Sequence, residues 1–113
     1  MIEQAITFAI EAAHQSEGDP RLHGHSYVVE ARTVKLRDFT TRDKEVQAVR
    51  YTVDHTFLSE SIGGTTMEYL AEWLLMRFAF LPAIRITIRR PTLGYVVEAK
   101  PEARLRAPGA TVG

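Results

Sequence analysis

The stretch that decides the fold is His23-Gly24-His25-Ser26-Tyr27-Val28-Val29-Glu30-Ala31, which has the composition of a long strand. Successive side chains of a strand point to opposite faces, so His23 and His25 share one face and Gly24 lies on the other. The missing side chain of Gly24 leaves room for another backbone or a ligand. Two imidazoles spaced in this way can bind one divalent metal ion if a third ligand comes from elsewhere. The chain has four histidines, of which His14 is the predicted third ligand. Three neutral nitrogens with one open position are typical of a catalytic zinc.

A first strand is predicted over residues 2–14. Its apolar residues recur at even positions and so line one face, which His14 closes; these residues are Ile2, Ile6, Phe8, Ile10 and Ala12. The turn residues Gly18-Asp19-Pro20 follow, so the two strands are predicted to form an antiparallel hairpin. His14 would then lie near His23 and His25. The plain alternative is a strand that ends in an incidental histidine.

Two helices are predicted after the hairpin. Residues 38–51 form the weaker one, with Asp38 or Thr40 as its N-cap. Residues 65–80 form the stronger one, because Thr65 and Glu68 have the spacing of a capping box and an apolar stripe follows at helical spacing. That stripe is predicted to pack against a sheet.

Residues 83–90 and 95–99 alternate between apolar and polar and are predicted as two further strands. The order β-β-α-α-β-β predicts an α+β fold with a four-stranded antiparallel sheet and both helices on one face. Residues 1–99 form the single predicted domain. Residues 100–113 contain prolines and glycine without an apolar period, which is typical of a mobile tail.

Asp54 and His55 are adjacent in a predicted loop. A carboxylate beside an imidazole raises its basicity and can orient the ring for proton transfer. A surface histidine with an acidic neighbour is the alternative reading of this dipeptide.

The composition excludes several classes of function. The 113 residues carry 14 basic and 14 acidic side chains, so no net charge favours nucleic acid or an anionic membrane as partner. No cysteine is present, which excludes disulfides, thiolate metal sites and a thiol nucleophile. No signal peptide and no membrane-spanning run are recognised, so the cytoplasm is the expected location.

Taken together, these motifs resemble the 6-pyruvoyl tetrahydropterin synthase family, which includes the 6-carboxytetrahydropterin synthases (QueD). The resemblance covers about residues 6–99. It rests on five segments in order: Phe8-Ala9-Ile10-Glu11-Ala12-Ala13-His14, Leu22-His23-Gly24-His25-Ser26-Tyr27, Asp38-Phe39, Val53-Asp54-His55-Thr56-Phe57-Leu58 and Thr65-Thr66-Met67-Glu68-Tyr69-Leu70-Ala71-Glu72-Trp73-Leu74. No single segment is specific, but their combination is.

The resemblance implies the tunnelling fold (T-fold), in which three sheets close into one barrel and two trimers stack into a hexamer. It implies Zn²⁺ on His14, His23 and His25, in a site at a subunit interface. In the family the zinc holds oxygens of the substrate's side chain and eases proton removal from the adjacent carbon. The matching Asp54 and His55 would serve as the proton relay.

This chain departs from the family at the expected catalytic cysteine. QueD-type members carry it four residues before the first histidine of the motif, where this chain has Asp19. A carboxylate with an ordinary pKa of about 3.9 is a much weaker base than a thiolate near 8.5. Asp19 is therefore a base with a raised pKa, a fourth zinc ligand that silences the site, or a turn residue.

A second departure follows the third predicted strand. The family has a Glu-Thr pair there, and its glutamate accepts hydrogen bonds from the pterin. This chain reads Ile88-Arg89-Arg90-Pro91, so Arg89 takes the place of that acceptor. If the alignment is shifted by one residue, Arg90 takes the place instead, and the acceptor is still replaced by an arginine. Arginine only donates, so it suits a carboxylate or phosphate instead. An outward-facing Arg89 is the alternative, and Glu68 and Glu98 are the remaining acidic candidates for substrate binding.

The sequence thus predicts a zinc-dependent, lyase-type enzyme that acts on a small oxygenated substrate, pterin-like or acidic, by other than the usual family reaction. Two rival hypotheses remain. The first is a catalytically silent T-fold protein that binds zinc and a ligand. The second is an oligomeric structural protein with incidental histidines.

Overall fold

The computed structural model describes residues 2–16, 19–34 and 42–101, and the side chains of these except 14–16 and 19–23. Two long strands, β1 (Glu3–Ser16) and β2 (Asp19–Val34), form an antiparallel hairpin. The strands β4 (Arg85–Arg90) and β5 (Tyr95–Ala99) form a second, shorter one. These four strands are the predicted antiparallel sheet, and the predicted α+β class is confirmed.

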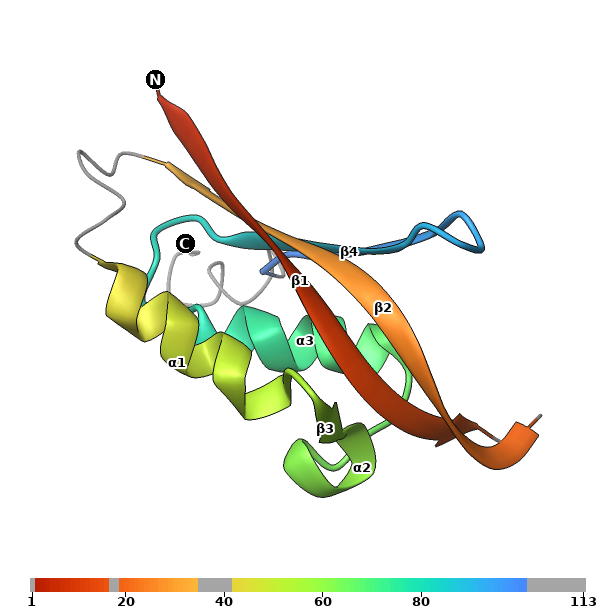
Figure 1. Ribbon diagram of the computed structural model, residues 1–113. Helices are drawn as coiled ribbons and strands as arrows, with labels where there is room; N and C mark the ends of the chain where they lie inside the picture. The colour runs from red at the N-terminus through yellow and green to blue at the C-terminus, as the bar shows by residue number, and fades with distance from the viewer. Residues whose placement is uncertain (1, 17–18, 35–41, 102–113) are drawn as a thin grey trace, which may run out of the picture.

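A fifth strand, β3 (Thr56–Phe57), pairs in parallel with β1, so the sheet order is β3-β1-β2-β4-β5. The helices are α1 (Asp43–Val53), α2 (Leu58–Ser61) and α3 (Met67–Arg77). Both long helices lie on one face of the sheet, as predicted (Figure 1). The strand β3 and the short helix α2 fall within residues 52–64, which the sequence predicts as a loop. Two residues carry too little periodicity to identify a strand, so β3 depends on its pairing with β1.

Strand alternation explains the core. Side chains on the helix-facing side of the sheet are buried, as the parity of the sequence predicted; they are Phe8, Ile10, Ala12, Tyr27, Val29, Ala31, Ile86 and Ile88. The helices contribute Val46 and Val53 from α1, and Leu70, Ala71 and Leu74 from α3. His25 belongs to the same face of β2 as Tyr27 and Val29. The core therefore fixes the face on which His25 lies.

The cap of α3 differs from the prediction. Thr66, not Thr65, is the N-cap, and its hydroxyl accepts a hydrogen bond from the N–H of Tyr69 at 3.0 Å. Two successive threonines satisfy the same capping pattern, so the sequence leaves the choice between them open by one residue. The helix ends at Arg77, three residues before the predicted end. The predicted caps Asp38 and Thr40 and most of the predicted tail lie outside the described residues.

No helix in the described part of the chain is long and apolar enough to cross a membrane.

Candidate active site

The β1–β2 hairpin brings the predicted metal ligands together along its backbone. In the register of the two strands His14 pairs directly with His23, and Ala12 pairs with His25. The three histidines therefore occupy neighbouring positions on two adjacent strands, as a shared ligand set requires. The imidazoles of His14 and His23 are outside the described side chains. Among the described side chains, which do not include these two rings, no three possible metal ligands lie together.

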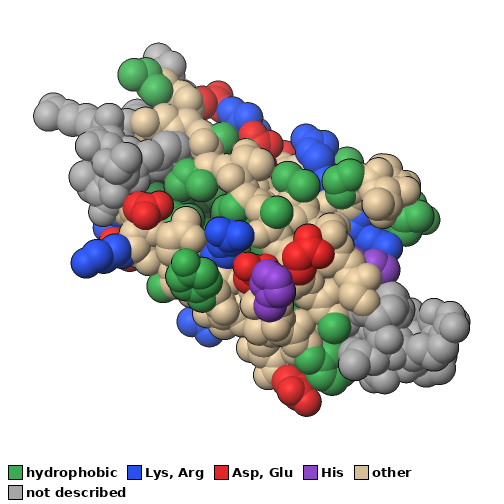
Figure 2. Space-filling view, viewed as in Figure 1, with side chains coloured by type: hydrophobic (Ala, Val, Ile, Leu, Met, Phe, Trp, Pro, Cys, Tyr) green, Lys and Arg blue, Asp and Glu red, His purple; other side chains and the backbone are tan. Residues whose placement is uncertain are grey.

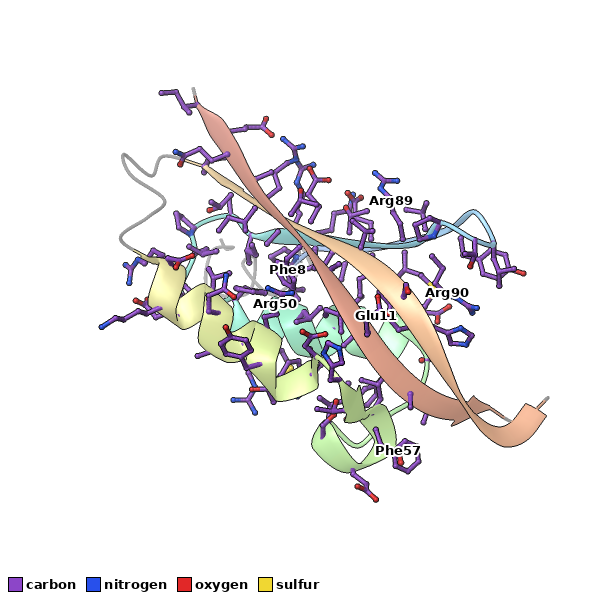
Figure 3. All side chains as sticks on the ribbon, viewed as in Figure 1. Phe8, Glu11, Arg50, Phe57, Arg89 and Arg90 are labelled. Atoms are coloured by element: carbon purple, nitrogen blue, oxygen red, sulfur yellow. The ribbon has the colours of Figure 1, made fainter. Side chains whose placement is uncertain are left out.

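The ring of His25 is described together with two of its neighbours. Its Nδ1 lies 2.8 Å from Nη2 of Arg90, and its ring meets the Tyr27 ring edge-on, with centroids 6.0 Å apart. Arg90 comes from the end of β4 and reaches this ring from the helix side of the sheet (Figure 3). A metal site at His25 would thus have a guanidinium beside it.

An open pocket of about 420 Å³ lies where β3 meets β1 and the start of β2. It is lined by Glu11, Ala12, Ala13, Gly24, His25, Ser26, His55, Thr56 and Phe57. Two of the predicted site residues, His25 and His55, therefore border the same cavity. On this face of the molecule an exposed histidine lies beside acidic side chains (Figure 2).

Asp54 and His55 form the predicted pair. The Oδ1 atom of Asp54 lies 3.1 Å from Nδ1 of His55 and also accepts a hydrogen bond from the N–H of Glu11 at 2.9 Å. The His55 side chain is 77% exposed, whereas that of Asp54 is only 11% exposed. A fixed carboxylate thus holds an accessible imidazole, as a proton relay requires.

The local backbone explains how this pair is positioned. Asp54 is the C-cap of α1, and His55 takes a left-handed φ of +59°, which few residues other than glycine adopt. The N–H of His55 donates to the carbonyl oxygen of Glu11. The chain therefore leaves α1 with both residues tied to β1, and β3 begins at the next residue. Non-glycine residues held in this conformation concentrate at functional sites.

The acidity of Asp54 follows from these contacts. Burial raises the pKa of its carboxyl, but the Glu11 N–H, the His55 ring and the Arg50 guanidinium together lower it more, so the pKa lies below its ordinary value. Asp54 is therefore ionised at neutral pH, the form that can orient an imidazolium.

Replacing Asp54 by asparagine is expected to flatten the acid limb of the stability curve. A depressed carboxyl pKa stabilises the fold above the unfolded value of about 3.9, and this contribution is lost as the pH falls through the lower folded pKa. The variant lacks the ionisable group, so its free energy of unfolding should fall less over that window. Urea denaturation at a series of pH values from neutral down to that window would measure the difference. Equal slopes for both proteins would contradict the described environment of Asp54.

Sequence reasoning gave no role to Glu11 or Ser26. The Ser26 hydroxyl donates to the Glu11 carboxylate at 2.8 Å, and both residues line the pocket. Glu11 also fixes Asp54 and His55 through its backbone. The sequence did contain a sign of this role. Glu11 is a carboxylate within the alternating pattern of β1, and it lies on the face of the strand opposite the core.

The predicted substrate residues are spread over the sheet. Arg89 is exposed, pairs with Val28 in the register, and lies on the opposite side of β4 from Arg90 (Figure 3). Glu68 and Glu98 line a different cavity of about 380 Å³ between α3 and β5, which none of the candidate histidines lines. The backbone of Asp19 pairs with Ser16, and its side chain is outside the described set.

Comparisons with known proteins give the fold and the family. A sequence profile of the family described as 6-pyruvoyl tetrahydropterin synthase matches residues 3–83. A search of curated proteins finds no match.

Solved structures of the same description are similar in fold. A Plasmodium vivax 6-pyruvoyltetrahydropterin synthase with a catalytic glutamate replaced by alanine shares 16% identity at a TM-score of 0.60, over 88% of this chain and 98% of that one. The Plasmodium falciparum protein shares 15% identity at a TM-score of 0.57, over 88% and 99% of the two chains. The profile covers well over half of the sequence, and the chain therefore belongs to the 6-pyruvoyl tetrahydropterin synthase family.

Proposed function

We propose that this chain is a zinc-dependent, lyase-type member of its family that acts on a small oxygenated substrate, pterin-like or acidic, by other than the usual family reaction. The observation that carries the proposal is the pocket shared by His25 and His55, next to the hairpin positions of His14 and His23. This supports a site in which a candidate metal ligand and a candidate proton carrier border one cavity.

His14, His23 and His25 would hold the zinc. The backbone register fits this set, since His14 and His23 are directly paired and His25 follows two residues later on the same face of β2. When bound, zinc acts as a Lewis acid on a substrate oxygen and acidifies the neighbouring C–H group.

His55 would take up the proton, with Asp54 stabilising the resulting imidazolium at 3.1 Å. Asp19 is the candidate for the second acid or base, in place of the missing cysteine. The catalytic residue replaced in the P. vivax protein is a glutamate, so a carboxylate serves in that enzyme. This supports a carboxylate role for Asp19 here.

Arginine in place of the pterin-binding glutamate supports a changed substrate. Arg90, on the face of β4 opposite the predicted Arg89, would select an acidic group, because a guanidinium has five donors and no acceptor. Glu68 could accept hydrogen bonds from the substrate only if a second copy of the chain brought the cavity between α3 and β5 next to the histidines.

A homo-oligomer, by family a hexamer of two trimers, is part of the proposal. Within the described sheet β3 covers only Ala12 and Ala13 of β1, and β5 forms the other edge with Tyr95 and Val96 exposed. Unpaired edges of this length favour pairing with another chain. Head-to-tail pairing of two different edges closes into a ring, as a barrel requires.

The proposal is tested by solvent deuterium exchange. Zinc-loaded protein is incubated in D₂O with dihydroneopterin triphosphate and with small hydroxycarbonyl compounds that carry a carboxylate or a phosphate. We expect exchange of the C–H next to the coordinated oxygen in one of the acidic compounds, dependent on zinc and at least about 100-fold slower in His55→Ala. Dihydroneopterin triphosphate should give little of either family product, with the P. vivax enzyme as positive control.

The outcomes separate the hypotheses. Rapid formation of either family product would refute the changed substrate. Zinc binding without exchange in any compound would favour the catalytically silent ligand-binding protein instead.

A further inference from the structure

The contact between Arg90 and His25 determines where the imidazole carries its proton. A guanidinium can only donate, so Nδ1 of His25 must accept from Nη2 of Arg90 at 2.8 Å. The proton of the neutral ring is then on Nε2. Neither nitrogen has a lone pair left for a metal ion. Metal ligation by His25 and its contact with Arg90 therefore exclude one another.

Arg90 is poorly compensated where it lies. It is half-buried at the end of β4, on the same face as the fully buried Ile86 and Ile88. Its Nε is buried without a hydrogen-bond partner in the described part of the molecule, and no described carboxylate forms an ion pair with it. A half-buried charge without a counter-ion is costly, and an anion that supplies one binds favourably.

We propose that Arg90 is a metal-responsive anion receptor. Its guanidinium leaves Nδ1 when the His25 ring ligates a metal, and then binds a carboxylate or phosphate group of a ligand beside His25, on the helix-facing side of the sheet. The inference rests on the proposed metal site and adds to it Arg90 as the residue that binds the anionic group of the ligand. Because linkage is reciprocal, metal and anion each raise the affinity for the other.

Arg89 provides a matched control. It is the adjacent residue on the same strand, is exposed, and lies on the opposite face of the sheet. Arg90→Met and Arg89→Met remove the same charge and leave a side chain of similar length. A difference between the variants therefore reports position and not net charge.

Zinc affinity is measured by competition with a fluorescent chelator, with no added anion and then with inorganic phosphate or acetate. Without anion, Arg90→Met is expected to bind zinc about 10-fold more tightly than the wild type, since one charge-assisted hydrogen bond no longer competes. Anion should tighten zinc binding in the wild type and in Arg89→Met, but not in Arg90→Met. The anion that raises the zinc affinity more, phosphate or acetate, identifies the ligand class as phosphate or carboxylate.

A second measurement tests the contact without metal. In zinc-free wild type, ¹⁵N shifts should show His25 protonated on Nε2, and in Arg90→Met this preference should be lost. Identical zinc and anion responses in both variants, or an Nδ1–H tautomer in the wild type, would overturn the inference while leaving the zinc site intact. Absence of zinc from wild type and both variants would overturn the metal site and the inference together.

Discussion

Replacing His23 by alanine is expected to abolish zinc binding at micromolar protein concentration. The wild-type chain should carry about one zinc after reconstitution, as a three-histidine site predicts. Loss of even an outer partner of a metal-bound histidine costs roughly 10–100-fold in affinity, so loss of a ligand should cost more than about 100-fold. Metal analysis after desalting, together with chelator competition, measures the change.

His55→Ala is the matched control for this prediction. His55 lines the same pocket as His25, but its Nδ1 faces Asp54, and it is predicted to carry protons and not metal. The variant should retain about one zinc per chain. Zinc retained by His23→Ala would contradict the three-histidine site, and zinc lost from His55→Ala would show that the pocket binds metal through a different set of ligands.

The sequence predicted the main sheet because burial imposes strict alternation on it. The even residues of β1 and the odd residues of β2 face the core, and this parity also puts His25 on the same side as Tyr27. The elements missed were those without a period of their own. The strand β3 has two residues and depends on Ala12 and Ala13 for its pairing, so it could not be identified from its own residues.

Prediction of the site was limited by contacts between distant residues. Asp54 and His55 are neighbours in the chain, and their pairing was anticipated. The Glu11 N–H that anchors Asp54 is 43 residues away, and Arg90 is 65 residues from His25. The sequence pointed to an arginine at this place but favoured Arg89. The alternation of β4 turns Arg90 to the face of Ile86 and Ile88 and turns Arg89 away. The pairing of β4 with β2 is a long-range contact, and it brings Arg90 next to His25.

The largest effect on stability is expected from Phe78→Ala. Phe78 is fully buried just past the end of α3, and its ring lies 6.3 Å from the ring of Phe8 on β1 and 6.0 Å from that of Phe80. Removing a buried phenylalanine side chain costs about 3–5 kcal/mol through lost transfer energy and the cavity left behind. Total stabilities of single domains are only about 5–15 kcal/mol. The variant should therefore lose much of its free energy of unfolding.

Met76→Ala is the control on the same helix, because Met76 is 77% exposed and should change the free energy of unfolding by less than about 0.5 kcal/mol. Urea denaturation at one fixed protein concentration, with zinc chelated throughout, keeps association and metal binding from contributing. A loss below about 1 kcal/mol in Phe78→Ala would contradict the described packing of Phe78 against Phe8. Phe78 is not among the residues that line the pocket, so zinc affinity measured under native conditions should change by less than about 3-fold. The two variants at His23 and Phe78 would then separate the metal site from the core that supports it.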